Sequence, residues 1–149
     1  MKASSFFTEE QQAQILASVR EAEKETSGEI RVHIETSFTG DVLDRAAWVF
    51  KKLGMHKTAE RNGVLFYLAV SDRKFAIIGD AGINAKVIAG FWNDISDLLM
   101  KQFKEGKFTE GLSEGIILAG KQLQAHFPYK EDDVNELPDE ISFDKLKGE

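Results

Sequence analysis

The amino-acid sequence predicts an α/β protein, a three-layer α/β/α sandwich with a small mixed β-sheet. Residues 63–70 are apolar throughout, which is typical of a central strand that helices cover on both faces. Residues 84–104 and 109–126 instead carry apolar side chains at helical spacing. A helical segment at 41–53 separates two strand-like segments. Such a strand–helix–strand unit places its strands parallel, with a right-handed crossover between them.

The first predicted helix begins at Thr8, which with Gln11 fits a capping box. It ends at Ser27-Gly28, where glycine suits the left-handed position after a helix. Residues 29–35 then alternate strictly between apolar and polar side chains, which predicts a strand near an edge of the sheet that is buried on one side only. The polar side, expected to be the more exposed one, consists of Glu29, Arg31, His33 and Glu35.

The next elements are a helix and a hairpin. Asp41 is expected to cap the helix, and Gly54 lies just beyond its end. The short link 71–74 joins the strand at 63–70 to a second apolar run at 75–79, which predicts an antiparallel pair of central strands. These two strands therefore form the predicted middle of the sheet.

Two long helices complete the predicted domain. The segment 84–104 contains Gly90 as a candidate break, and the segment 109–126 carries a single apolar stripe. The hydrophobic periodicity stops after this helix, although residues 139–143 could add a short edge strand.

Length and charge indicate one domain with a tail. A chain of 149 residues fits a single domain, which we place at residues 1–129, and the acidic tail follows at 130–149. This tail holds eight of the 25 acidic residues and three of the 19 basic ones, so the body is nearly neutral. A basic face that could bind nucleic acid is not visible, and we expect no nucleic-acid partner.

Two further features of the sequence bear on the cellular location of the protein and on the kinds of site it can form. No segment approaches the roughly 20 apolar residues that span a bilayer, and Met1–Phe7 does not resemble a secretory signal. We therefore expect no membrane span and a cytoplasmic location. The sequence has no cysteine, which excludes disulfides, thiolate metal sites and thiol nucleophiles.

The candidate site lies at one end of the sheet. Because the strands at 63–70 and 75–79 are expected to run antiparallel, the loops 55–62 and 80–84 must meet there, beside the start of the strand at 29–35. Oxygen donors and one imidazole gather in these loops, and hard cations such as Ca²⁺ and Mg²⁺ prefer oxygen ligands. The candidate metal ligands are Asp80, Glu60, Asn62, Asn84, His56 and Glu29.

The opposite end of the sheet offers a second set of polar residues. In open α/β sheets ligands bind beyond the carboxyl ends of the parallel strands, which is this end. An aspartate with an arginine there could serve phosphoryl chemistry, but Asp41 is explained as a helix cap and Asp72-Arg73 as a hairpin turn. Neither His33 nor His126 has a serine or cysteine partner at a recognisable spacing, so the sequence supports no hydrolase triad.

Several short motifs together resemble the TPM domain, a family of thylakoid-lumen, bacterial and animal proteins. The resemblance covers about residues 8–127. The motifs that carry it are Ser27-Gly28-Glu29-Ile30-Arg31-Val32, Arg61-Asn62-Gly63-Val64-Leu65, Asp72-Arg73-Lys74, Ile78-Gly79-Asp80-Ala81-Gly82-Ile83-Asn84 and the pattern Phe103, Gly106, Phe108, Gly111, Leu112.

The resemblance implies an α/β/α sandwich and an association with divalent cations. It also implies one of two activities, because a plant relative is described as an acid phosphatase and other relatives as assembly or accessory factors. Many relatives read Gly-Tyr-Gly-Leu-Glu where this chain reads Asp80-Ala81-Gly82-Ile83-Asn84. We therefore expect any metal site to be rearranged, with an acid lost at Asn84 and another gained at Asp80.

Two functional hypotheses follow. In the first, the chain is a stand-alone TPM-like module that binds divalent metal, Ca²⁺ or alternatively Mg²⁺, and regulates or contacts an unidentified protein partner. In the second, it is a metal-dependent acid phosphatase that acts on phosphomonoesters, with no identifiable protein nucleophile. We prefer the first hypothesis because no base or phosphate-binding cation is recognisable near the acids.

Overall fold

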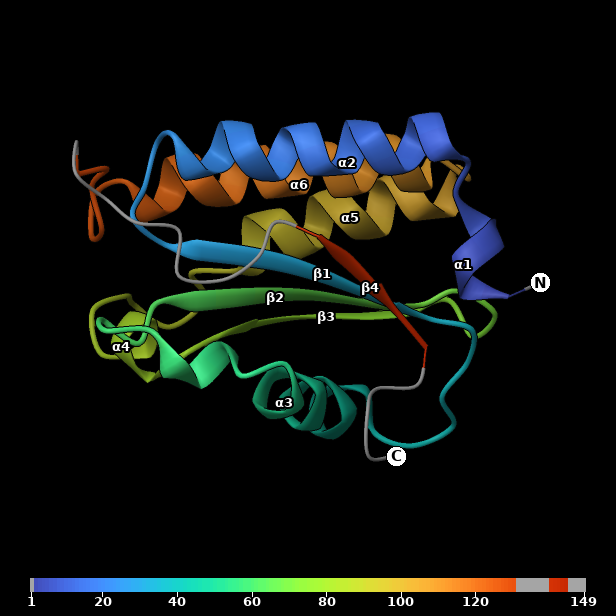
Figure 1. Cartoon of the computed structure of the whole chain (residues 1–149), viewed down its shortest axis with the longest axis horizontal. Coiled ribbons are helices and arrows are strands. Elements are labelled where there is room, and N and C mark those ends of the chain that lie inside the picture. Colours follow the sequence, from blue (N-terminus) through green and yellow to red (C-terminus); the bar gives the residue numbers. More distant parts are fainter. Residues whose placement is uncertain (1, 131–139, 145–149) are drawn as a thin grey trace.

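The computed structural model describes residues 2–130 and 140–144. It is an α/β/α sandwich, as predicted, with one four-stranded mixed sheet in the middle layer (Figure 1). The elements in chain order are α1 (Ala3–Phe6), α2 (Glu9–Glu23), β1 (Glu29–Glu35), α3 (Val42–Lys52), the 3₁₀ turn η1 (Met55–Lys57), β2 (Gly63–Ala69), β3 (Lys74–Gly79), α4 (Ala81–Asn84), α5 (Asn93–Lys104), α6 (Phe108–Leu123) and β4 (Ile141–Phe143).

The strand order is β3-β2-β1-β4. The pairs β1–β2 and β1–β4 are parallel, and β2–β3 is antiparallel, as the hairpin prediction required. The prediction that β2 is central and buried on both faces is confirmed, because all of its residues are buried. The short strand expected near the chain's end is also confirmed, as β4.

The expected positions of two other strands are wrong. β1 lies inside the sheet because β4 pairs with its outer edge, and β3, which was expected to be central, lies at the end of the strand order. The residues of β3 are accordingly less buried than those of β2. An apolar run thus indicates a strand that is covered on its faces, but it does not tell which strand has a neighbour on each edge.

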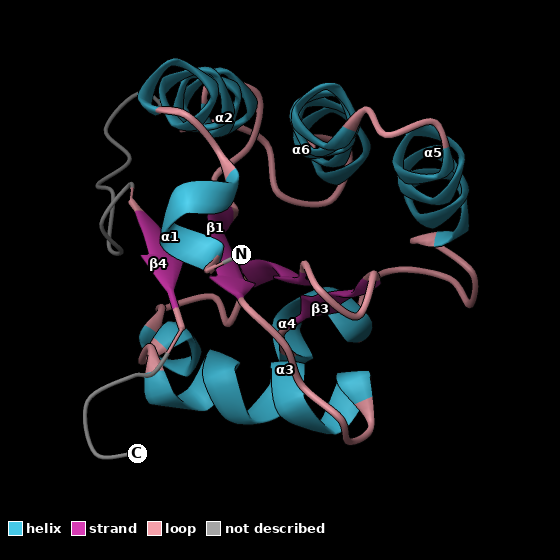
Figure 2. Ribbon diagram, turned by 90° about the vertical axis from the view of Figure 1, so that its right-hand side faces the viewer, coloured by secondary structure: helices cyan, strands magenta, loops and turns pink. Residues whose placement is uncertain are grey.

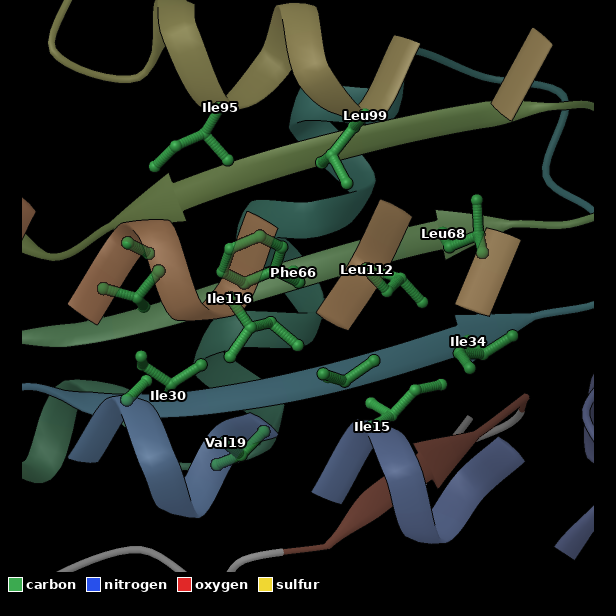
Figure 3. Packing of buried hydrophobic residues seen from close by; sticks show 14 of the residues in the cluster. Ile15, Val19, Ile30, Ile34, Phe66, Leu68, Ile95, Leu99, Leu112 and Ile116 are labelled. Carbon is green, nitrogen blue, oxygen red and sulfur yellow. The ribbon is translucent and has the colours of Figure 1, made fainter. Parts of the chain in front are cut away.

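Helices α2, α5 and α6 lie side by side on one face of the sheet, and α3 covers the other face (Figure 2). The larger core fills the space under the three helices, where side chains of the helices meet alternate residues of β1 and β2 (Figure 3). Burying one such side chain stabilises the fold by about 1.5–3 kcal/mol. Ile15, Ile116, Ile34 and Ile95 each have no exposed surface.

The helix boundaries follow local signals with two exceptions. The capping box of Thr8 and Gln11 and the cap at Asp41 are present, and Gly54 adopts a left-handed conformation with φ 73°. However, α2 ends at Glu23, several residues before the predicted end at Ser27-Gly28. The predicted helix 84–104 is interrupted from residue 85 to residue 92.

The interruption contains Gly90, with φ 82°, as the candidate break required. Residues 85–92 thus form a connection between the short helix α4 and the longer α5. Among the described residues, no helix is both long and apolar enough to cross a membrane.

Candidate functional site

The predicted meeting of two loops at one end of the sheet is confirmed. The backbone N–H of Gly82 donates to the carbonyl of Arg61 at 2.9 Å, and that of Asp80 donates to Gly63 at 3.0 Å. The contact is so close that only glycine fits at position 82, because a Cβ there would lie 2.0 Å from the carbonyl oxygen of Glu60. The start of β1 joins the same end, since the N–H of Glu29 donates to the Asn62 carbonyl at 3.2 Å.

Asp80 is the charged centre of this loop end. It is 7% exposed, and its carboxylate accepts the Ala81 N–H at 2.7 Å, which starts the short helix α4. Arg61 binds the same carboxylate with two hydrogen bonds, Nε to Oδ2 at 2.7 Å and Nη2 to Oδ1 at 2.8 Å. The hydrogen bonds and the charge of Asp80 raise the pKa of Arg61. The buried carboxylate is therefore neutralised by a guanidinium.

Arg61 binds Asp80 from the solvent side. Its side chain is 49% exposed, whereas that of Asp80 is 6% exposed. Its backbone has φ 52°, in the left-handed region that a residue with a Cβ rarely adopts. The carboxylate is thus fixed in the fold while its cationic partner has solvent on one side.

Glu60 and Asn62 meet around Ser27. The Oε2 atom of Glu60 accepts from the Ser27 hydroxyl at 3.4 Å and from the Lys130 ammonium at 3.3 Å. Asn62 is 2% exposed, and its Nδ2 donates to the Ser27 carbonyl at 3.2 Å. Its Oδ1 is buried and has no hydrogen-bond partner in the described part of the chain. Asn62 therefore offers an unused amide oxygen at this end of the sheet.

The other predicted ligands do not join Asp80. Asn84 is exposed and its Nδ2 donates to the Gly79 carbonyl at 3.2 Å, which fixes the turn into α4. His56 lines a hollow with lysines of α3 and η1, on the side of the sheet that α3 covers. Glu29 is 3% exposed and, by the alternation of a strand, lies on the same side of β1 as Arg31.

The donor set fits a hard cation only in part. Within residues 2–130 and 140–144, the structure brings together no group of three or more His, Asp or Glu side chains that could hold a metal ion. Asp80, the best-placed acid, already has both oxygens on Arg61. A cation could therefore bind Asp80 only after the guanidinium leaves.

The predicted exposure of the polar side of β1 is wrong. Arg31, His33 and Glu35 are 4%, 0% and 3% exposed. Helix α3 covers this side of the sheet and brings Arg45 to Glu35, while β4 lies along the edge of β1. The alternating pattern of residues 29–35 is thus a buried polar row rather than a solvated face.

Glu35 is the centre of this row. Burial alone would raise its pKa, but hydrogen bonds from His33, Arg45 and Tyr67 outweigh burial and lower the pKa from 4.5 to about 2. Arg45 Nε lies 2.9 Å from Oε1, and His33 Nε2 lies 3.1 Å from Oε2. Burial and the bond to Glu35 in turn raise the pKa of Tyr67 well above its usual value of 10. Glu35 is therefore an ionised carboxylate inside the fold.

A hydroxyl completes the row from the far end of the chain. Ser142 Oγ lies 2.7 Å from His33 Nδ1. The Ser142 hydroxyl also donates to the Val32 carbonyl at 3.4 Å, so Ser142 contacts both the ring and the backbone of β1. The order Ser–His–Glu matches that of a hydrolase triad, but His33 has no exposed surface and no substrate can reach its ring. The row therefore connects β4 to β1 by side chains.

Sequence reasoning missed this row because the partners lie far apart in the chain. Ser142 is 109 residues from His33, and Arg45 sits in the helix that follows the strand. The alternating charged residues of the strand gave no signal of this row, because the same pattern is typical of a solvated strand face.

Comparisons with known proteins agree with the fold. A family model described as the TPM domain matches residues 1–122. The BA42 protein from the psychrophilic bacterium Bizionia argentinensis, known from an NMR structure, is 48% identical with a TM-score of 0.89, and the match covers 93% of this chain and 96% of that one. None of the curated proteins matches the chain.

Two more distant NMR structures share the fold alone. The N-terminal domain of a P. gingivalis protein is 20% identical with a TM-score of 0.68, over 83% of this chain and 80% of that one. The N-terminal domain of the cg2496 protein from Corynebacterium glutamicum is 12% identical with a TM-score of 0.62, over 93% of this chain and 81% of that one.

Proposed function

The chain belongs to the TPM domain family. From that premise we propose that it is a module that binds a divalent cation through the carboxylate of Asp80. One observation carries the proposal. The carboxylate of Asp80 is fixed and nearly buried, whereas the guanidinium of Arg61 that neutralises it is half-exposed. Arg61 is therefore the removable partner of the pair, and a hard cation such as Ca²⁺ or Mg²⁺ takes its place.

The exchange follows from the charges. A carboxylate with little exposed surface needs a positive charge nearby, and a guanidinium and a divalent ion satisfy the same need. The Arg61 side chain can move away from Asp80 into solvent at little cost, because about half of it already faces water. The two compete for Asp80, so we expect weak binding, in the millimolar range of weak Ca²⁺ modules.

Further oxygens are available at the same end of the sheet. Asn62 Oδ1 is a buried acceptor without a hydrogen-bond partner among the described residues, and Glu60 is a second acid in the adjoining loop. Hard cations accept carboxylate, amide and water oxygens together. We assign Asp80 as the anchor and Glu60 and Asn62 as the supporting ligands, with Asn84, His56 and Glu29 as the remaining candidates.

The phosphatase alternative has less support. A phosphatase needs a group that activates the attacking nucleophile or stabilises the phosphoryl charge. Asp80 is bound by Arg61 without the cation and by the cation in its presence, so it is not free to act as a base in either state. We therefore propose a regulatory or interaction module rather than an enzyme, with a protein as the partner.

Thermal unfolding of the full chain with and without millimolar CaCl₂ tests the proposal. A ligand that binds only the native state stabilises it by RT ln(1 + [L]/Kd), about 2.7 kcal/mol at a hundredfold excess over Kd. We expect Ca²⁺ to raise the Tm, and Asp80→Ala and Glu60→Ala to abolish the rise. Asp72→Ala is the matched control, because Asp72 binds the Phe38 N–H near the opposite end of the sheet.

The acidic tail is the rival binding site, and a second variant separates the two. Asp132→Asn and Asp133→Asn together remove two adjacent acids of the tail from the full chain. A Ca²⁺ response that survives Asp80→Ala but disappears in this double variant would place the cation on the tail and refute our assignment.

A further inference from the structure

The strand β4 is attached to β1 by side chains as well as by the sheet. It runs parallel to β1, with Ser142 opposite His33. The polar residues of the segment 140–144, which includes one residue on each side of β4, alternate with apolar ones, and each of them contacts a group of β1 or of the residue just after it. These contacts are Glu140 Oε1 to Arg31 Nη2 at 3.2 Å, Ser142 Oγ to His33 Nδ1 at 2.7 Å, and Asp144 Oδ1 to the Thr36 N–H at 2.7 Å.

The intervening residues of β4 are apolar and face the larger core. Ile141 and Phe143 are partly buried and pack against the cluster under α2, α5 and α6. The segment 140–144 therefore presents two different sides to the domain. Its residues are, in order, an acid, an aliphatic, a hydroxyl, an aromatic and an acid. The three polar ones bind β1 or Thr36, and the two apolar ones pack against the larger core.

The attachment is small enough to be reversible. β4 pairs with β1 over three residues, all of which are only partly buried. Short strands of this kind belong to the least stable parts of a fold and open locally more readily than the core. In addition, the family match ends at residue 122, so β4 lies outside the matched domain whose edge it covers.

The edge of β1 has the properties of a peptide-binding strand. Without β4 the backbone groups of residues 32–34 that face it would be unpaired, and such an edge accepts an extended peptide by strand addition. Arg31 and His33 add specificity, because both are nearly buried and point at the acid and the hydroxyl of the occupant.

We propose that the edge of β1 is a docking site for an extended peptide of a partner protein with the pattern acid–aliphatic–hydroxyl–aromatic–acid, and that residues 140–144 occupy this site as a displaceable strand. The partner peptide runs parallel to β1 and places its hydroxyl opposite His33. The chain's own tail is thus an intramolecular competitor that keeps the site closed until a partner replaces it.

The tether sets the strength of this competition. A segment linked to its own site acts at an effective concentration on the order of millimolar. A free peptide with the same contacts must compete against that concentration and binds much more weakly to the closed site than to the open one. A change that releases residues 140–144 from the edge of β1 therefore raises the apparent affinity of this edge for a free peptide, although the edge itself is unchanged.

A labelled peptide with the sequence of residues 138–146 tests the proposal by fluorescence anisotropy. It is titrated with the full-length wild-type chain and with the full-length variants Phe143→Asp and Glu140→Lys. Phe143→Asp places a charge against the core, and Glu140→Lys faces Arg31 with a like charge. We expect both variants to bind the peptide at least tenfold more tightly than the wild type.

Glu140→Lys keeps the test informative if Phe143→Asp fails to fold, because the Glu140 side chain is 62% exposed. A control peptide with Ser142→Ala should bind the open variants at least fivefold more weakly, since it lacks the hydroxyl that contacts His33 Nδ1. Equal affinity for the wild type and both variants, or no binding to any of them, would overturn the proposal. So would a wild-type dimer in sedimentation that Glu140→Lys abolishes, because the tail would then dock on a second copy.

Discussion

The ionised state of Glu35 gives the most quantitative prediction, which concerns the substitution Glu35→Gln. The pKa of Glu35 is lowered from 4.5 to about 2 in the folded chain, and each pKa unit corresponds to about 1.4 kcal/mol. The carboxylate therefore stabilises the fold by about 3 kcal/mol at neutral pH. Because the folded-state pKa is depressed, this contribution is complete above pH 4.5 and is lost as the pH falls towards 2.

The measurement is the free energy of unfolding in urea for wild type and Glu35→Gln, between pH 6 and pH 3. We expect the difference between the two proteins to shrink by about 2 kcal/mol over this range, since most of the 3 kcal/mol is lost by pH 3. The loss of the carboxylate that Arg45 binds adds a cost that does not vary with pH in this range.

Tyr67→Phe is the milder companion variant. It removes one of the hydrogen bonds that lower the pKa of Glu35 and keeps the carboxylate, so its difference from wild type should shrink by less. A difference between wild type and Glu35→Gln that is the same at pH 6 and pH 3 would show that Glu35 is not held ionised by its neighbours.

Two further predictions concern the loop end. Gly82→Ala should destabilise the fold by about 1–3 kcal/mol in urea unfolding, because its Cβ would lie 2.0 Å from the Glu60 carbonyl and must push the two loops apart; an unchanged midpoint would contradict the close approach. With Ca²⁺ or Mg²⁺ present, we expect little or no hydrolysis of p-nitrophenyl phosphate, because Asp80 is bound either by Arg61 or by the cation and is not free to act as a base. A rate well above background that both EDTA and Asp80→Asn abolish would favour the phosphatase hypothesis instead.

Most of the fold could be predicted because each signal is local. The capping box at Thr8, the cap at Asp41 and the apolar run of β2 depend on residues that are close in sequence. The neighbours of a strand depend on distant segments, and for this reason β1 was placed at an edge. Nothing within residues 29–35 indicates that β4, more than 100 residues later, pairs with this strand.

The candidate site was predictable in position but not in detail. The antiparallel pairing of β2 and β3 fixes which loops meet, and the bond between Gly82 and Arg61 follows from it. The pairing of Arg61 with Asp80 could not be predicted, because Arg61 has a left-handed backbone, which a residue with a Cβ rarely adopts. In the same way, the charges of β1 suggested solvent exposure, whereas Arg45 and Tyr67 satisfy Glu35 inside the fold.

The Ca²⁺ affinity of Arg61→Gln, measured by isothermal titration calorimetry on the full chain, tests whether a cation and Arg61 exchange on Asp80. Glutamine removes the guanidinium that competes for Asp80 and keeps a polar side chain of similar length, while Arg61→Lys keeps the positive charge as a control. If a cation and Arg61 exchange on Asp80, Arg61→Gln binds Ca²⁺ at least tenfold more tightly than the wild type, and Arg61→Lys remains weak. An affinity for Arg61→Gln equal to or below that of the wild type would contradict the exchange and remove Asp80 as the cation ligand.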